Sequence, residues 1–236
     1  MKERLDKFIS SRTALSRKEV QRALKDKRVL LNGMLTRSGD DKIDTETDVI
    51  TLDGQALSGE THVYYMMNKP AGVVSATEDR DERTVLDILP AELMRKGLFP
   101  AGRLDKDTTG LLIITDDGEY AHRMLSPKKH VTKRYIATLD KAPGSEIAER
   151  FAAGITLGDG TVCKSGRAEP LDDSRAAVEI SEGKYHQVKR MFAALGYKVT
   201  ALERVRIGAL ELDEALKPGE VKKLTSEEAQ KVFDQI

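Results

Sequence analysis

The chain has 236 residues, of which 39% are hydrophobic and 33% charged, a composition typical of a soluble globular protein with one or two domains. Lys and Arg number 39 and Asp and Glu also number 39, so the formal net charge is zero. No apolar run approaches the roughly 18 residues of a membrane span, and the charged N-terminus excludes a secretory signal. The single cysteine, Cys163, excludes an internal disulfide framework, and no His/Cys spacing indicates a metal site. We therefore expect a cytoplasmic protein without a bound metal.

Charge is unevenly distributed along the chain. Residues 1–38 hold eleven Lys and Arg against four Asp and Glu, a local charge of +7. Residues 120–139 hold five basic residues and no acid, and residues 184–206 hold six against Glu203 alone. The last 28 residues are acidic, with four Lys against seven acids. Solvated helix faces explain any one basic segment, but three together predict a positive face that binds a polyanion.

The first 57 residues have the pattern of a small basic domain. Leu5, Phe8 and Ile9 are spaced as on one face of a short helix. Ser16 and Glu19 form a capping-box pattern that opens a second helix. Two dipeptides typical of tight hairpin turns follow, which predicts a small sheet. These turns are Asn32-Gly33 and Asp53-Gly54.

This segment resembles the small RNA-binding domain first described in a ribosomal protein of the small subunit. The resemblance implies an RNA-binding domain at 1–58 and, with the polar residues that follow, a linker at 59–62. Lys27 stands where that domain usually has Gly or Asn, and a left-handed backbone costs Lys about 1–2 kcal/mol, so we expect a differently built turn. The matching residues are Arg4 to Phe8, Ser16-Arg17 and Arg28-Val29 leading into Asn32-Gly33. The expected RNA contacts are Arg4, Lys7, Arg17 and Lys18.

From residue 63 onward, strand patterns outnumber helical ones and do not alternate with them regularly. We therefore expect a second domain at 63–236 of the α+β class, built on a large mixed or antiparallel sheet. Strands are expected at 63–67, 73–75, 111–115, 135–139, 177–181 and 197–202. Helices are expected at 119–125, at 145–153 with Ser145 as its cap, and at 186–195 ending before Gly196.

A polar loop between Gly102 and Gly110 carries the first chemical signal. Asp105 and Asp107 lie beside basic residues, and a nearby opposite charge keeps a carboxylate ionised, as a nucleophile or base requires. An ordinary glycine-flanked turn explains the composition of this loop about as well. A second polar segment, Glu182 to Met191, begins as a glycine turn and continues as a basic helix. Taken alone, its histidine and its cations indicate only a structural residue and surface charges.

Four motifs standing in order resemble the ribosomal small subunit pseudouridine synthase family over essentially the whole chain. The nonapeptide of the polar loop is the most specific of them. The resemblance implies a pseudouridine synthase fold and the isomerisation of a uridine in ribosomal RNA, without a cofactor or metal. The motifs are Asn68-Lys69-Pro70 with Gly72, Gly102 to Gly110 followed by Leu111, Lys133-Arg134-Tyr135, and Glu182 to Met191.

The resemblance also assigns roles to individual residues. It makes Asp105 the carboxylate that attacks the uridine nucleotide and Tyr135 the ring that lies against the base. Lys189 becomes the cation paired with Asp105, with Arg190 as its alternative, and Arg103 fills the gap left by the extruded uridine. Further RNA contacts near the site are expected at Asn68, Lys69, Asp107 and Thr109, and phosphate contacts at Lys128 and Lys129.

Other functions fit parts of the pattern. Asp105 to Thr109 superficially matches the DxDxT signature of haloacid-dehalogenase-type phosphatases, but Pro100 and Gly102 interrupt the strand that should precede it. A non-catalytic RNA-binding assembly factor explains the basic segments but not a carboxylate among them. A synthase acting on large-subunit rRNA remains open, as does the choice between free rRNA and an assembling particle. We expect the protein to act as a monomer.

Overall fold

The computed structural model describes residues 2–57 and 59–234. Their contacts divide the chain into two units, Met1–His62 with Leu89–Leu98, and Val63–Ile88 with Phe99–Ile236. Residues 89–98, which we expected in the second domain, thus belong to the first unit. Arg95 donates to the carbonyl of Thr61, and the Lys96 amide donates to the carbonyl of Thr13. No helix in the described part of the chain is long and apolar enough to cross a membrane.

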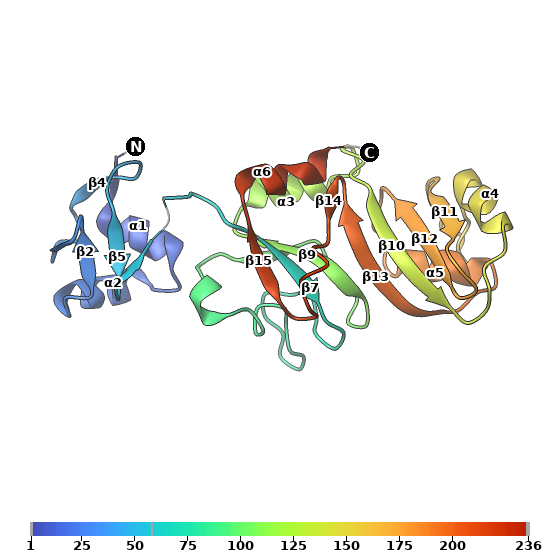
Figure 1. Cartoon of the computed structure of the whole chain (residues 1–236), viewed down its shortest axis with the longest axis horizontal. Coiled ribbons are helices and arrows are strands. Elements are labelled where there is room, and N and C mark those ends of the chain that lie inside the picture. Colours follow the sequence, from blue (N-terminus) through green and yellow to red (C-terminus); the bar gives the residue numbers. More distant parts are fainter. Residues whose placement is uncertain (1, 58, 235–236) are drawn as a thin grey trace. The chain divides into compact units, whose positions relative to one another are not determined.

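The first unit contains two helices and two small antiparallel sheets (Figure 1). The expected helices are confirmed, and Ser16 and Glu19 form the capping box in both directions. Apolar side chains from both helices, among them Phe8 and Leu24, are buried against the strands. The elements are α1 (Leu5–Arg12), α2 (Arg17–Lys25), the sheet β3-β2-β5-β6 (Met34–Leu35, Val29–Leu31, Ile50–Leu52, Gln55–Ala56) and the pair β1 (Lys2–Arg4) with β4 (Lys42–Asp44).

Both expected hairpin turns are present. Asn32 and Gly33 have φ of 51° and 79°, and Asp53 and Gly54 have φ of 52° and 81°, as tight two-residue turns require. The expectation for Lys27 was wrong, because Lys27 itself takes the left-handed conformation with φ of 59°. Its amide donates to the carbonyl of Leu24 and so ends α2, a position where Gly would avoid the steric cost.

The second unit is built on a nine-stranded mixed sheet (Figure 1). Neighbouring strands are antiparallel except β13 and β9, which run parallel over two residue pairs. The main order is β11-β12-β10-β13-β9-β7-β15, with β14 paired to β13 and β8 to β9. The strands are β7 (Tyr64–Lys69), β8 (Phe99–Ala101), β9 (Thr109–Thr115), β10 (Lys133–Leu139), β11 (Arg167–Pro170), β12 (Arg175–Ile180), β13 (Val199–Ile207), β14 (Leu210–Glu211) and β15 (Val221–Leu224).

Two pairs of helices pack at different parts of this sheet. Near β7 and β9, α3 and α6 share a core in which Tyr120 contacts Tyr64 and Phe233 and donates its hydroxyl to the carbonyl of Ala229. Near β11 and β12, α4 and α5 meet through Phe151 and Phe192 (Figure 1). The helices are α3 (Gly118–Leu125), α4 (Glu146–Ala153), α5 (Gln187–Ala194) and α6 (Ser226–Gln230), with the short 3₁₀ turn η2 (Lys231–Phe233); a second such turn, η1 (Ala91–Leu93), lies in the first unit.

Some expectations for the second unit were wrong in detail. Residues 73–75 form no strand, since Val74 makes only an isolated bridge to Thr84. Ser145 precedes α4, but its backbone is helical and its side chain makes no cap bond. The strands expected around 63–67, 111–115, 135–139, 177–181 and 197–202 are present with shifted ends, and Gly196 follows the last residues of α5 with φ of 81°.

Candidate active site

The loop between β8 and β9, residues 102–108, begins at one glycine and is followed, at the second residue of β9, by another, and the geometry requires both. Gly102 and Gly110 have φ of 94° and 96°. At Gly110 a Cβ atom would lie 2.3 Å from the carbonyl oxygen of Arg204, because β9 meets β13 there. Only glycine permits that approach. The close approach at Gly110 therefore fixes where the loop joins the sheet. Asp105 lies at the centre of the loop.

Lys69 holds this loop in place through hydrogen bonds to its backbone carbonyls. Its side chain is completely buried, and Nζ donates to the carbonyls of Pro70 (3.0 Å), Asp105 (3.1 Å), Lys106 (3.4 Å) and Thr108 (2.9 Å). Burial lowers the pKa of this ammonium to about 8, partly offset by the nearby carboxylates. The buried Lys69 side chain therefore does not face RNA as expected, and instead holds the loop that contains Asp105.

A buried serine fixes the other side of the loop. Ser75 Oγ donates to the carbonyl of Leu104 and accepts from its amide, both at 3.0 Å. The residue before Asp105 is thus held through both of its backbone polar groups. The sequence carried no signal for Ser75, because it lies in a segment without regular structure.

Asn68 and Thr109 are strand residues expected to contact RNA near the site. Asn68 is buried, and its amide donates to the carbonyl of Leu216, because alternate residues of β7 point to opposite faces. Thr109 Oγ1 donates to the carbonyl of Leu202 at 3.4 Å, so it connects β9 to β13. Both side chains bond within the protein, and Asn68 lines a cavity with Leu216 that Asp105 does not border, so an RNA contact at either residue stays a prediction.

Helix α5 and the residue before it bring two nitrogen-bearing side chains to Asp105. His186 Nε2 lies 3.4 Å from Asp105 Oδ1, and Lys189 Nζ lies 3.5 Å from Oδ2. Lys189 makes a shorter contact, 2.6 Å, with Asp107 Oδ1, and this hydrogen bond is the largest cause of the lowered pKa of Asp107. The expected ion pair between Lys189 and Asp105 is present, but Asp107 shares the cation.

Arg190 points to a different partner. It forms an ion pair with Asp159 and donates to the carbonyl of Tyr185 at 3.3 Å. The alternative in which Arg190 pairs with Asp105 is therefore contradicted. His186, which the sequence gave no reason to prefer over a structural histidine, takes that place.

Tyr135 lies on β10, where it pairs with Arg204 of β13 and Val178 of β12. Its ring is nearly buried and lines a small cavity of about 90 Å³ together with Asp105 and Thr108. The sheet thus places an aromatic side chain beside the carboxylate, as the sequence motifs implied. The other lining residues are Arg103, Leu104, Ile180, Gly183, Lys184, His186, Gln187, Val188 and Leu202.

A larger, open cavity of about 530 Å³ also borders Asp105. Six residues line both cavities, so Asp105 stands at their common wall. Exposed Arg103 is one of the six and makes no ion pair with any described residue. The shared residues are Arg103, Leu104, Asp105, Gly183, Lys184 and His186, and the larger cavity adds Val74, Ser75, Lys106 and Tyr185.

The turn before α5 is held by polar side chains of the fourth sequence motif. The sequence alone assigned these side chains no role. Gln187 is buried, its Nε2 donates to Glu182 Oε1 at 2.7 Å, and its Oε1 accepts from the Lys184 amide at 2.8 Å. Lys184 forms an ion pair with Glu182. These contacts fix the turn that presents His186 to the loop.

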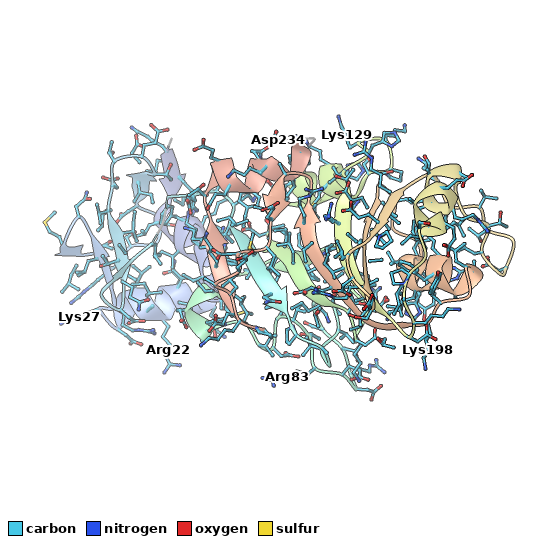
Figure 2. All side chains as sticks on the ribbon, turned by 45° about the vertical axis from the view of Figure 1, so that its right-hand side comes forward. Arg22, Lys27, Arg83, Lys129, Lys198 and Asp234 are labelled. Atoms are coloured by element: carbon cyan, nitrogen blue, oxygen red, sulfur yellow. The ribbon has the colours of Figure 1, made fainter. Side chains whose placement is uncertain are left out.

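The basic residues expected to contact phosphates lie on the surface. Lys128 and Lys129 are exposed on the segment between α3 and β10, where Lys129 extends away from the sheet (Figure 2). In the first unit, Arg17 and Lys18 are exposed and form no ion pair with the described residues. Arg4 and Lys7 are engaged with Asp6, Asp40 and Glu3.

This arrangement suits nucleophilic chemistry on a flat substrate. Asp105 is partly exposed, held by its backbone, and flanked by His186 Nε2 at 3.4 Å and the Lys189 ammonium at 3.5 Å. Tyr135 offers an aromatic edge or face to a ring in the adjacent cavity. No group of three His, Cys, Asp or Glu side chains within 2–57 and 59–234 has a metal-binding arrangement.

Comparison with known proteins agrees with this geometry. The family model described as RNA pseudouridylate synthase matches residues 63–194, which contain all of the loop, Tyr135 and α5. A ribosomal small subunit pseudouridine synthase A from Yersinia pestis is 45% identical over 227 residues, covering 95% of this chain and 96% of that protein. An uncharacterised RNA pseudouridine synthase from Bacillus subtilis is 44% identical over 229 residues, covering 95% and 96%.

The fold has a counterpart among solved structures. A crystal structure titled pseudouridylate synthase superimposes with a TM-score of 0.68 at 42% sequence identity, covering 97% of this chain and 99% of that one. The α+β class and the family resemblance expected from the sequence are both confirmed. With a family model matching more than half of its length and relatives alike over nearly all of it, this chain belongs to the RNA pseudouridylate synthase family.

Proposed function

We propose that this protein converts a uridine of small-subunit ribosomal RNA into pseudouridine. The observation that carries the proposal is the placement of Asp105, held between Ser75-bound Leu104 and the Lys69 anchor, at the wall of a cavity that contains the Tyr135 ring. Relatives named ribosomal small subunit pseudouridine synthase A match this chain over 95% of its length, which supports the choice of RNA.

The reaction requires that the uridine leave the RNA stack, at a cost of a few kcal/mol. Arg103, exposed beside the cavity and without an ion pair in the described structure, occupies the gap left by the base. Asp105 then attacks the uridine nucleotide, the bond between C1′ and N1 breaks, and the base turns. A bond forms between C1′ and C5 as the bond between C1′ and Asp105 breaks, the C5 proton leaves, and N1 takes up a proton. The sum is an isomerisation with no net change of oxidation state.

The surrounding residues have distinct tasks in this mechanism. Tyr135 stacks against the base and lies near the proton that must leave C5. Lys189 and His186 stabilise negative charge on the Asp105 oxygens before attack and again when the enzyme is released. Asp107 holds Lys189 in place through its 2.6 Å contact. These side chains come from β10, from the loop between β8 and β9, and from α5 with the turn before it.

The first unit supplies affinity for RNA in this proposal. Exposed Arg17 and Lys18 at the start of α2 bind phosphates, and Lys128 and Lys129 of the second unit bind phosphates separately. We propose that the protein acts as a monomer in the cytoplasm, on free rRNA or on an assembling particle.

The test is to map pseudouridines in both ribosomal RNAs of a strain that lacks the gene. We expect one uridine of the small-subunit RNA to lose its modification, and purified protein to restore it on a transcript of that RNA. Release of tritium from C5-labelled uridine measures the rate. Loss of a pseudouridine from the large-subunit RNA instead would overturn the choice of substrate, and no loss from either would overturn the function.

A further inference from the structure

Among the described residues of the second unit, Tyr185 is the most exposed large apolar side chain, at 75% of its full exposure. It lies in the turn before α5 and lines the larger cavity beside Asp105. Arg190 holds its backbone carbonyl, so the position of the residue is set although its ring is open to solvent. None of the roles proposed for Asp105, Tyr135 and Lys189 involves the Tyr185 ring.

The ring is already stacked on one side. Its centroid lies 3.8 Å from that of His186, with 19° between the planes. His186 adopts φ of 48°, a left-handed conformation that costs a residue with a Cβ about 1–2 kcal/mol. Strain of this kind persists where the surrounding structure uses it, often at a functional site. Here it brings His186 to Asp105 and Tyr185 onto His186.

The cavity beside the ring suits an unpaired nucleobase. It is open, about 530 Å³ in volume, and lined by Arg103 and Lys184 in addition to the two rings. Bases freed from their stack are bound in proteins by aromatic faces, with cations nearby for the phosphates. The smaller cavity beside Tyr135 lies across the common wall and is assigned to the uridine itself.

We propose that Tyr185 and His186 form a stacking platform for the nucleobase next to the extruded uridine. The inference rests on the proposed function, because it needs an RNA with one base removed from the stack. Stacking on Tyr185 keeps the neighbouring base from closing over the vacated position. It also sets the distance between that base and Asp105, since His186 contacts both the platform ring and the carboxylate.

The chain contains no tryptophan, so Tyr185→Trp introduces a unique fluorescent reporter at the platform. We expect its emission to fall by about half or more when a small-subunit rRNA transcript binds, because stacked bases quench indole. Leu171→Trp, at an exposed position outside both cavities, is the matched control and should change little. Equal responses of the two reporters would overturn the platform.

Kinetics give an independent measurement. Tyr185→Ala should raise KM for the transcript on the order of 5- to 150-fold, the equivalent of about 1–3 kcal/mol per stacked base, while kcat stays within about threefold. Tyr185→Phe and Tyr185→Trp, which keep the ring, should retain the parental KM. A fall in kcat with unchanged KM would show that Tyr185 only supports His186, and would overturn the inference.

The inference and the proposed function fail in different ways. If Asp105→Asn is inactive and Tyr185→Ala matches the parent protein, the platform is wrong and the function stands. If the parent protein forms no pseudouridine in either RNA, the function fails, and quenching of the Tyr185→Trp reporter by RNA then reports binding alone.

Discussion

Lys189 lies between two carboxylates and is closer to Asp107, at 2.6 Å, than to Asp105, at 3.5 Å. Asp107 is largely exposed, whereas the Asp105 side chain is mostly buried. The exposed carboxylate therefore positions the cation, and the less exposed one is directed into the cavities. Mutations of the two aspartates should therefore affect activity to different extents.

Asp105→Asn should abolish pseudouridine formation while leaving folding and RNA affinity nearly unchanged, because an amide keeps the shape but is no nucleophile. Asp107→Asn should cost much less, since Lys189 then moves wholly to Asp105. Tritium release from C5-labelled transcripts measures both variants. Activity of Asp105→Asn within about tenfold of the parent, or the reverse ranking, would contradict the assignment.

Lys189→Met should lower turnover by about 100-fold or more, because it removes a cation placed to stabilise charge on Asp105. The salt dependence of RNA binding should change little. Arg17→Met is the comparison variant, and its loss of a phosphate contact should reduce the salt slope by roughly 0.7–0.9. Filter binding across a salt series, with single-turnover rates at saturating protein, distinguishes the two behaviours. A normal single-turnover rate with a smaller salt slope for Lys189→Met would show that Lys189 binds an RNA phosphate instead.

Lys69→Met should destabilise the second unit and misplace the catalytic loop. Four carbonyls lose their donor, and the buried one of Thr108 is left unpaired at a cost of about 1–3 kcal/mol, so the free energy of unfolding should fall by at least that amount. Urea unfolding measures this loss, and single-turnover rates at low temperature report the loop. Unchanged stability with weakened RNA binding would restore the RNA contact first expected for Lys69.

Lys133 provides a test by pH. Its side chain is buried, donates to the carbonyl of Val131, and has a pKa lowered to about 8 by burial. Between pH 8 and about 10.5 the unfolded chain therefore holds the proton more tightly than the folded chain, and the contribution of this group to stability rises with pH. We expect the stability of Lys133→Met relative to the parent to fall by up to about 3 kcal/mol across that window. A constant difference would contradict the lowered pKa.

Removal of residues 1–62 should leave a folded second unit with weaker rRNA binding. The apolar core of α3, α6 and the sheet contains only residues from Tyr64 onward, so it does not depend on the first unit. Residues 89–98 lose the partners Thr13 and Thr61, and local disorder is expected there. Circular dichroism and hydrogen exchange test both statements, and global unfolding of the truncated protein would contradict the division.

Local chemistry in the sequence was sufficient for α1, α2 and the hairpin turns, whereas the catalytic candidates came from the resemblance of four ordered motifs to a known family. The Ser16 capping box and the Asn32-Gly33 turn act within a few residues, so they could be predicted from the printed sequence. The loop of Asp105 was recognisable because its glycines and charges are adjacent in the chain. What these residues contact depends on segments far away in the chain.

Only the tertiary structure decided which side chains face the cavities and which hold the protein together. Lys69 and Asn68 are adjacent in a strand, and the pleat directs one beneath the catalytic loop and the other toward Leu216. Lys189 and Arg190 are adjacent in a helix, and their different directions give one to the aspartates and the other to Asp159. His186 reaches Asp105 through a left-handed backbone that no local pattern predicts. The sequence shows which charged residues are present. The direction of each side chain follows from the packing of strands and helices that are separated by scores of residues.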